Sequence, residues 1–431
     1  MITLIKGATV VMPNGKTQES DIVIQGNIIK SIGIAEDGLA ADNVINGKGK
    51  LAVPGFVNTH THASMTLLRS YADDMNLMDW LNNMIWPIEA KMHKKDIYAG
   101  AMLAAVEMIK TGTTTFADMY GDMEQVAQMT IESGLRGVLS RGIIGIAPNG
   151  EQAFKEGKEL FDNFNGAADG RITVMFGPHA PYTCPPDFLR RVAEAARERS
   201  ADIHIHLAET KGEVEDCRKN YGKTPMEIME DTGIFDCGTL GAHCVWLSDS
   251  DIEIMAKHHV RVAHNPGSNM KLASGIAPVT KLLKAGITVG LGTDGASSNN
   301  NLDMLEEIRL AALLHKVDTL DPLAVPAFEA LKMGTEYGAK AVGLNNIGRI
   351  EEGAIADITL FNMSSYAWQP KFDLVSLLVY SAPSNSADTV IVDGRVLMEK
   401  GELKTIDEER IIHEAAQSVE RITAWEGRYC C

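Results

Sequence analysis

The sequence predicts an α/β protein: a (β/α)8 TIM barrel with a small β-sandwich built from both chain termini. The first observation is that short apolar runs alternate with helical stretches from residue 54 to 349, which is typical of a parallel sheet. The second is that the segments before and after this part, residues 1–53 and 350–431, contain short β-rich runs. The third is a set of metal-type residues, each at the end of an apolar run: His60, His62, His206, His243 and Asp294. Because parallel barrel strands end on one face, these residues could meet there.

Residues 1–53 are predicted to form the first part of the sandwich. Turn signals at residues 13–15 and 25–27 separate β-rich runs such as residues 21–24. Residues 350–431 are predicted to complete it, with a strand at residues 356–361, a hairpin at 389–396 and a terminal helix at 408–424. The chain ends therefore belong together, beside the barrel.

The barrel is predicted over residues 54–349. Helical stretches such as 99–110 and 188–199 lie between its strands. A doubly wound open sheet is the rival architecture, but ligand-type residues end several strands instead of gathering at one switch point. The eight predicted strands are 53–59, 113–118, 136–143, 172–178, 202–207, 239–244, 260–264 and 287–293.

Composition narrows the function classes. The 431 residues carry a formal net charge of −17, which argues against non-specific nucleic-acid binding. No signal-peptide pattern opens the chain, and no run of about 18 apolar residues indicates a membrane span. The six cysteines form no CxxC pair, and the vicinal Cys430 and Cys431 receive no role. We expect a reduced, cytoplasmic setting without nucleic-acid or membrane partners.

The spacing of the histidines indicates a metal site. His60 and His62 stand at i and i+2 on a strand, so both side chains face one side. His204 and His206 share this spacing, and His206, nearer the strand end, is the expected ligand, with His204 in the core or behind a ligand. Three imidazoles and one carboxylate suit Zn²⁺ or a similar divalent ion with an open water position.

Further side chains near these strand ends could act on a substrate. Glu209, three residues after His206, could exchange protons with water and a leaving group; alternatively it is a helix N-terminal acid. Asp294 could point inward or belong to a plain Asp-Gly turn. Trp80 and Trp86 could pack in the core or form an aromatic wall for a planar ligand, with Glu89 binding hydroxyls.

These segments together resemble the amidohydrolase superfamily. The resemblance covers nearly the whole chain and includes residues 53–62, the strand ends already named, and residues 353–357 and 392–394. Within the superfamily, the chain most resembles the 5-methylthioadenosine/S-adenosylhomocysteine deaminases and the similar 5′-deoxyadenosine deaminases. The segments that carry this likeness are residues 86–89, 177–182, 206–209, 264–272 and 292–299.

The resemblance implies a role for each residue. One divalent ion per chain, Zn²⁺ with Fe²⁺ or Mn²⁺ as alternatives, would be bound by His60, His62, His206 and Asp294. His243 would hydrogen-bond the metal-bound water or the leaving group. Glu209 would move protons and contact the purine.

The same resemblance implies a nucleoside pocket. His179 and Glu89 would hold the nucleoside, with Glu89 on the ribose hydroxyls. Trp80 and Arg141 would lie near the 5′ substituent. Ser298 would contact the base edge or support Asp294.

The implied activity is hydrolytic deamination of adenosine-type nucleosides to inosine analogues and ammonia. The substrates would be 5-methylthioadenosine, S-adenosylhomocysteine, 5′-deoxyadenosine and adenosine, and the enzyme would be a homo-oligomer, a dimer or a tetramer. The alternatives are a guanine deaminase, a triazine-type chlorohydrolase or, from another class, a non-catalytic scaffold.

Two departures refine this picture. Residues 149–155 lack the second arginine that some family members carry, so we expect weaker affinity for S-adenosylhomocysteine. His179 stands where a lysine would be needed for a carbamate-bridged pair of metals, which favours a single ion.

Overall fold

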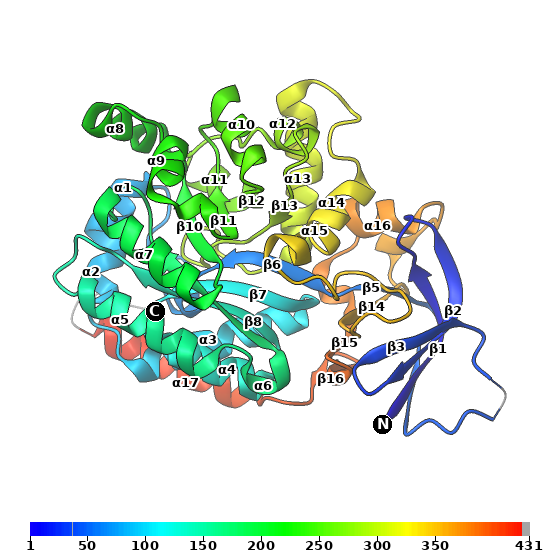
Figure 1. Ribbon diagram of the computed structural model, residues 1–431. Coiled ribbons are helices and arrows are strands. Elements are labelled where there is room, and N and C mark those ends of the chain that lie inside the picture. Colours follow the sequence, from blue (N-terminus) through cyan, green and yellow to red (C-terminus); the bar gives the residue numbers. More distant parts are fainter. Residues whose placement is uncertain (37, 425–431) are drawn as a thin grey trace.

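A parallel eight-stranded barrel forms the body of the protein (Figure 1), and the predicted fold class is confirmed. The computed structural model describes residues 1–36 and 38–424. The barrel strands are β6 (Phe56–Thr61), β7 (Thr113–Tyr120), β8 (Arg136–Ile143), β9 (Ile172–Pro178), β10 (Ile203–Leu207), β11 (Thr239–His243), β12 (Arg261–His264) and β13 (Val289–Leu291).

The strands follow the chain in sheet order, from β6 to β13. Their apolar and threonine-rich runs are almost wholly buried, as expected of parallel strands that are covered on both faces. Across the remaining gap between β13 and β6, the backbone N–H of Asp294 donates to the carbonyl oxygen of His60 at 2.9 Å. The first and the last barrel strands, each followed or ended by metal-type residues, are thus joined at this edge.

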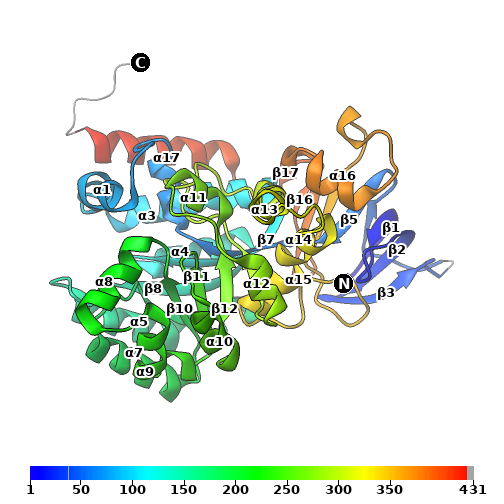
Figure 2. The ribbon, with the colours of Figure 1, turned by 90° about the horizontal axis from the view of Figure 1, so that it is seen from above.

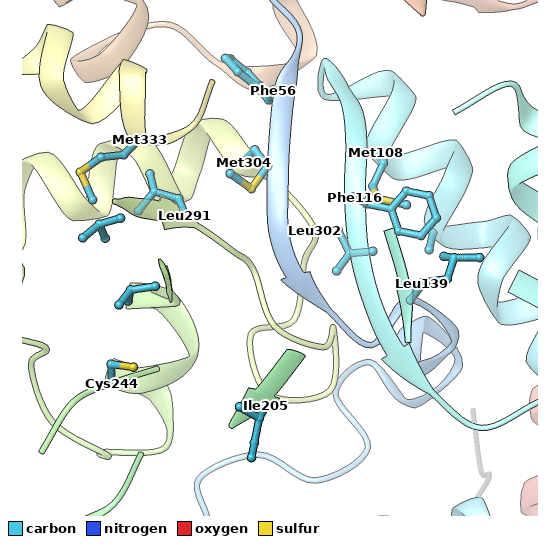
Figure 3. Close-up of a cluster of buried hydrophobic side chains, with 14 of the residues drawn as sticks. Phe56, Met108, Phe116, Leu139, Ile205, Cys244, Leu291, Leu302, Met304 and Met333 are labelled. Atoms are coloured by element: carbon cyan, nitrogen blue, oxygen red, sulfur yellow. The ribbon is translucent and has the colours of Figure 1, made fainter. Parts of the chain in front are cut away.

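Side chains alternate along the barrel strands between two apolar cores, one between the strands and the surrounding helices and one inside the barrel. One set, including Phe56, Phe116 and Leu139, packs against methionines of the surrounding helices such as Met108 and Met304 (Figure 3). The residues next to them point to the opposite face of the sheet, inside the barrel. The barrel is therefore a filled scaffold, and the open space lies at its mouth.

Helices cover the outside of the barrel (Figure 1). Between β7 and β12 they are α4 (Met123–Ser133), α5 (Gly150–Phe164), α6 (Ala167–Gly170), α7 (Pro186–Arg199), α8 (Lys211–Tyr221), α9 (Pro225–Thr232), the short η3 (Ile234–Asp236) and α10 (Asp249–Lys257). After β12 come α11 (Pro266–Lys271), α12 (Val279–Lys284), α13 (Met304–Thr319), α14 (Ala327–Met333) and α15 (Glu336–Ala341).

The chain ends build one nine-stranded mixed sheet beside the barrel. Its N-terminal and C-terminal halves are joined where β5 and β14 pair antiparallel, with Ala52 opposite Leu360. The strands are β1 (Ile2–Val11), β2 (Thr17–Gln25), β3 (Ile28–Gly33), β4 (Asn43–Asn46), β5 (Lys50–Pro54), β14 (Ile358–Asn362), β15 (Ala387–Val392), β16 (Arg395–Glu399) and β17 (Glu402–Leu403). Between β14 and β15 lie η4 (Tyr366–Trp368), α16 (Leu374–Tyr380) and η5 (Ser384–Ser386).

A buried arginine ties this sheet to the barrel. Arg136, at the start of β8, donates from Nε and Nη2 to the two carboxylate oxygens of Asp357, at 2.9 and 3.2 Å. The backbone N–H of Asp393 also donates to Asp357 at 2.7 Å. A two-pronged arginine–carboxylate contact fixes orientation as well as distance. Asp357 and Asp393, the aspartates of the sequence motifs at residues 353–357 and 392–394, therefore have a structural role.

The segment between β6 and α3 (Lys94–Lys110) is irregular and contains four short pieces. These are η1 (Ala63–Leu68), α1 (Leu77–Asp79), the single π-helical turn η2 (Trp80–Ile85) and α2 (Trp86–Glu89). The C-terminal helix α17 (Glu408–Thr423) lies along α3 and close to η1 (Figure 2). Its Ala415 and Ile422 join the apolar cluster of this segment, so the end of the chain supports one wall of the barrel mouth.

None of the described helices combines the length and apolarity needed to cross a membrane. Cys184, Cys217, Cys237 and Cys244 are free and buried. Cys430 and Cys431 lie outside the described residues.

Candidate active site

A cavity of about 280 Å³ opens at the C-terminal ends of the barrel strands. It brings together nine of the residues that the sequence singled out. These are His62, Trp80, Glu89, Arg141, His179, His206, Glu209, His243 and Asp294. His60 is fully buried beside them, and Ser298 is buried behind Asp294.

The metal-type side chains converge on one point. Asp294 Oδ1 lies 3.3 Å from His60 Nε2 and 3.2 Å from His62 Nε2. His206 Nε2 lies 3.4 Å from His62 Nε2. His60 and Asp294 also form a compact group with His243. The expected four ligands therefore have their donor atoms close enough together to share one ion.

The other ring nitrogen of each histidine is held from behind. His62 Nδ1 donates to the carbonyl oxygen of Met119 at 2.6 Å, and His206 Nδ1 donates to that of His179 at 2.7 Å. His60 Nδ1 lies 2.8 Å from His204 Nε2, so His204 supports His60 from behind. Such contacts fix the tautomer that turns the Nε2 lone pair toward a metal.

The electrostatics also fit a divalent cation. His60 Nε2 is buried and has no hydrogen-bond partner among the described residues, although a carboxylate faces it. Burial lowers the pKa of His60 to about 4, which keeps it neutral as a ligand must be. Burial also opposes charge on His62, but Asp294 outweighs that effect and raises the pKa of His62 to about 9. A cation would replace that proton as the partner of Asp294.

The backbone is turned sharply where it presents these side chains. Ala208, His243 and Asp294 have φ angles of 49°, 70° and 61°, in the left-handed region that non-glycine residues rarely adopt. Each stands at or just after a barrel strand. Before Asp294, Gly292 leaves no room for a side chain, because a Cβ there would lie 2.7 Å from the backbone nitrogen of His60. Such strain at strand ends is typical of functional sites.

Two further groups face each other beside the metal-type cluster. Glu209 Oε2 lies 3.7 Å from His243 Nε2, and both side chains are buried. Burial raises the pKa of the Glu209 carboxyl, with the nearby Asp294 charge acting in the same direction. His243 Nδ1 contacts Asn269 Oδ1 at 2.8 Å, which turns Nε2 into the cavity. A carboxyl of this kind can take and return protons.

An aromatic wall of the cavity contains side chains that were expected to hold a nucleoside. Trp80 is almost fully buried and lines the cavity together with Trp86. Glu89 accepts a short hydrogen bond from the hydroxyl of Tyr120, and burial raises the pKa of its carboxyl. The cavity therefore has an aromatic wall with one carboxyl group, and Tyr120 connects that carboxyl to the metal-type cluster, since its ring centroid lies 6.3 Å from that of His62.

The remaining expected residues differ in their surroundings. The ring of His179 lies tilted against that of His206, with centroids 4.8 Å apart, and its Nδ1 contacts Thr183 Oγ1 at 3.0 Å, while burial lowers its pKa to about 3. Arg141 lines the cavity but is paired with Glu156. Ser298 donates to Asp294 Oδ2 at 2.9 Å, so its position matches support of Asp294, the second of its two expected roles.

Sequence reasoning missed several supporting residues. Tyr120 holds Glu89, Asn269 orients His243, and Ser268 donates to Asp294 at 2.6 Å. Glu213 accepts the backbone N–H groups of Ala208 and Glu209, at 2.8 and 3.0 Å, and so fixes the turn after β10. Tyr120 ends a barrel strand, and that position could have flagged it; the others follow only from the folded arrangement.

A barrel with a His/Asp cluster at its C-terminal mouth defines a class of metal-dependent hydrolases. Comparison with known proteins agrees: the amidohydrolase family model matches residues 51–397. The chain belongs to the amidohydrolase family.

Proteins similar to this chain include nucleoside deaminases and an atrazine chlorohydrolase. A 5-methylthioadenosine/S-adenosylhomocysteine deaminase of Pelotomaculum thermopropionicum is 53% identical over 425 residues, which is 97% of this chain and 98% of that protein. An adenosine deaminase structure from Xanthomonas campestris with bound zinc has a TM-score of 0.94 and 32% identity, covering 98% of both chains. A zinc complex of an atrazine chlorohydrolase from Arthrobacter aurescens has a TM-score of 0.90 and 25% identity, covering 97% of this chain and 100% of that one.

Proposed function

We propose that this protein is a hydrolytic deaminase that converts 5-methylthioadenosine and related adenosine-type nucleosides to their inosine analogues and ammonia. One observation carries the proposal. Glu209 and His243 face each other 3.7 Å apart beside the His/Asp cluster, in a cavity whose other wall bears Glu89. The groups suited to proton transfer, Glu209 and His243, and the carboxyl suited to binding hydroxyls, Glu89, thus line the same small cavity. The name of the relative that is 53% identical supports the same substrate class.

The metal in this proposal is one divalent ion per chain, Zn²⁺ in preference to Fe²⁺ or Mn²⁺. Its ligands would be the side chains whose donor atoms converge: His60, His62, His206 and Asp294. When bound, Zn²⁺ supplies a Lewis acid that lowers the pKa of water to about 7. The bound zinc of the deaminase and chlorohydrolase structures supports this choice.

The chain's own side chains carry the proton transfers. Glu209 takes a proton from the water whose oxygen adds to C6 of the purine, and burial, which raises the pKa of its carboxyl, makes it a better proton acceptor. The same carboxyl then returns the proton to the amino group as the C6–N bond breaks and ammonia leaves. His243, oriented by Asn269, steadies the oxygen on C6, while Ser268 and Ser298 hold Asp294 in place.

The aromatic wall with Glu89 holds the nucleoside. Glu89 accepts hydrogen bonds from the 2′- and 3′-hydroxyls of ribose, and charge-assisted bonds of this kind are strong. Trp80 offers an aromatic surface, and His179, kept neutral by burial, can donate or accept one hydrogen bond. A guanine deaminase or a triazine hydrolase would have no ribose for Glu89 to bind. We further expect a cytoplasmic dimer or tetramer.

A substrate panel tests the proposal. Purified, metal-loaded protein is incubated with adenosine, 5′-deoxyadenosine, 5-methylthioadenosine, S-adenosylhomocysteine, guanine, cytosine and a triazine, and ammonia or chloride release is measured. Release of ammonia from the adenosine-type nucleosides alone is the expected result. Faster turnover of guanine or of the triazine would contradict the proposal.

A further inference from the structure

Arg141 is the one arginine among the described residues that line the active-site cavity, and it is held in an ion pair. Arg141, near the end of β8, lines the cavity across the barrel mouth from Glu209 and His243, which follow β10 and end β11. Its Nε donates to Glu156 Oε2 at 2.9 Å, and its Nη1 donates to the carbonyl oxygen of Gly142 in a short contact. The only cation expected at the 5′ end of a nucleoside therefore already has partners.

Glu156 belongs to an acidic rim that continues out of the cavity. A second hollow beside α5 shares Asp122 with the active-site cavity and is lined also by Lys94, Glu124 and Glu156. Lys94 forms a short contact with Glu124 and lies 3.9 Å from Asp122. With Glu159, four carboxylates thus line this hollow, and Lys94 is the one cation among its described lining residues. Burial raises the pKa of Asp122, and the charges of Glu124 and Glu156 act in the same direction while Lys94 and Arg141 oppose them.

We propose that Glu156 is a specificity-determining residue, which neutralises Arg141 and makes the cavity select neutral or cationic 5′ substituents over anionic ones. This inference rests on the proposed function and names the preference of the same site. An anionic tail would have to displace Glu156 from Arg141 or remain unpaired near Asp122, and a desolvated, unpaired charge is costly.

Nearby cations offer such a tail no substitute. Within residues 149–155, Lys155 lies 3.4 Å from Glu159 and its side chain is 64% exposed. Arg191, on α7, is engaged by Glu151 in a two-pronged contact at 2.7 Å. The described residues around Arg141 therefore supply no second arginine for a carboxylate.

The same ion pair could instead receive a zwitterion, with Arg141 binding the carboxylate of a homocysteine tail and Glu156 its ammonium. The hydrogen bonds argue against this arrangement. Glu156 Oε1 accepts from Gln152 Nε2 at 3.1 Å and Oε2 accepts from Arg141, so both oxygens are engaged. Two donor nitrogens of Arg141 are engaged as well. These contacts favour neutralisation of Arg141 by Glu156 over a site for a zwitterionic tail.

The experiment compares tails of different charge on one nucleoside. Wild-type protein and Glu156→Gln are assayed with 5′-thioadenosines that carry a neutral butyl, a cationic aminopropyl or an anionic carboxypropyl tail, and with S-adenosylhomocysteine. In the wild type, kcat/KM should be lowest for the anionic tail. In Glu156→Gln, the ratio of kcat/KM for the anionic tail to that for the neutral tail should rise about tenfold.

Two further variants assign the effect. Asp162→Asn removes a carboxylate from the same helix, but one that pairs with Arg199 and lines neither hollow, and should leave the ratio unchanged. Adding Arg141→Gln to Glu156→Gln should abolish the gain, because the freed guanidinium is then missing.

Each other outcome has a distinct meaning. An unchanged ratio in Glu156→Gln would overturn the inference, and a specific loss of S-adenosylhomocysteine turnover would overturn it in favour of the zwitterion site. If the wild type releases no ammonia from any nucleoside, the proposed function fails instead. Equilibrium dialysis of the same four compounds against each variant then still reports the tail preference, and equal affinities for all tails would overturn the inference.

Discussion

The two walls of the cavity are built in different ways. The metal-side wall consists of strand ends, with His60, His206 and Asp294 buried and each held by at least one further hydrogen bond. The nucleoside-side wall is the irregular segment of residues 63–93. There Glu89 depends on one hydrogen bond from Tyr120, and the indole N–H of Trp80 has no hydrogen-bond partner among the described residues.

This difference separates chemistry from substrate choice. Groups that must stand at fixed distances from one another are carried by rigid, doubly covered strands, where neighbouring side chains lock each rotamer. Groups that recognise the rest of the substrate are carried by a connecting segment, which can change without disturbing the barrel. We therefore expect mutations on the metal side to abolish turnover, and mutations on the nucleoside side to change affinity and preference.

The largest effect is expected from His206→Ala. Removing one converging imidazole should abolish both metal retention and ammonia release, because the remaining ligands no longer complete the site. Elemental analysis and the ammonia assay measure the two losses, and wild-type protein should hold one ion per chain. His258→Ala, at a half-buried histidine paired with Glu230, is the matched control and should keep both properties. Two ions per wild-type chain would contradict the single-metal site.

Glu209→Gln should separate chemistry from metal binding. The amide keeps the size of the side chain but cannot exchange protons, so activity should fall by at least about 10²-fold while the metal is retained. Single-turnover ammonia release and elemental analysis on the same sample measure both. Glu215→Gln, an exposed acid on α8, provides the control. Near-native turnover of a metal-loaded Glu209→Gln protein would remove Glu209 from the mechanism.

The metal-side wall was also the more predictable one. Strand–helix alternation predicted all eight barrel strands, and each predicted strand overlaps the observed one. The positions of His60, His206 and Asp294 at strand ends then brought their side chains together by topology alone. Their convergence needed no knowledge of loops, because the C-terminal ends of parallel barrel strands share one face.

The nucleoside-side wall shows where such reasoning stops. Tyr120 reaches Glu89 across 31 positions of sequence, and Glu156 reaches Arg141 from the following helix. Neither contact has a periodic signal, since each depends on how an irregular segment or a helix packs on the barrel. Arg141 was expected to be available to a substrate tail, whereas its pairing with Glu156 emerges only from the fold. Local pattern predicts elements well, and contacts between connecting segments poorly.

Glu89→Ala should have the largest effect on the nucleoside side. Loss of hydrogen bonds to the ribose hydroxyls should lower kcat/KM for 5′-deoxyadenosine by roughly 10–100-fold, while metal content is unchanged. A substrate without the 2′- and 3′-hydroxyls should lose far less on the same mutation, and this pair of comparisons isolates the ribose contact. If free adenine is a good substrate of the wild type, Glu89 does not have this role.

The smallest effect is expected where the C-terminal helix supports the nucleoside side. Arg421 on α17 donates from Nε to Asp96 at 3.2 Å and also makes a short contact with it through Nη2. Asp96 is fully buried and accepts the backbone N–H of His93 at 2.7 Å, at the start of α3. Arg421→Met keeps the apolar stem but leaves Asp96 without its charged partner. Because Arg421 is partly exposed, we expect a loss of only about 1–2 kcal/mol in the free energy of unfolding.

Arg421→Met should affect nucleoside binding at the nucleoside-side wall and leave the metal-side wall unchanged. The ion pair anchors α17 next to the cluster that contains Trp80 and Leu81, so KM for nucleosides should rise about twofold to fivefold, near the 1 kcal/mol scale. The metal content and kcat should stay close to the wild-type values, because the strand ends do not depend on α17. Arg410→Met, on the same helix but 4.0 Å from its partner Glu414, is the control. Loss of metal or of kcat at constant KM would show that the two walls are coupled, and the comparison between them would then have to be abandoned.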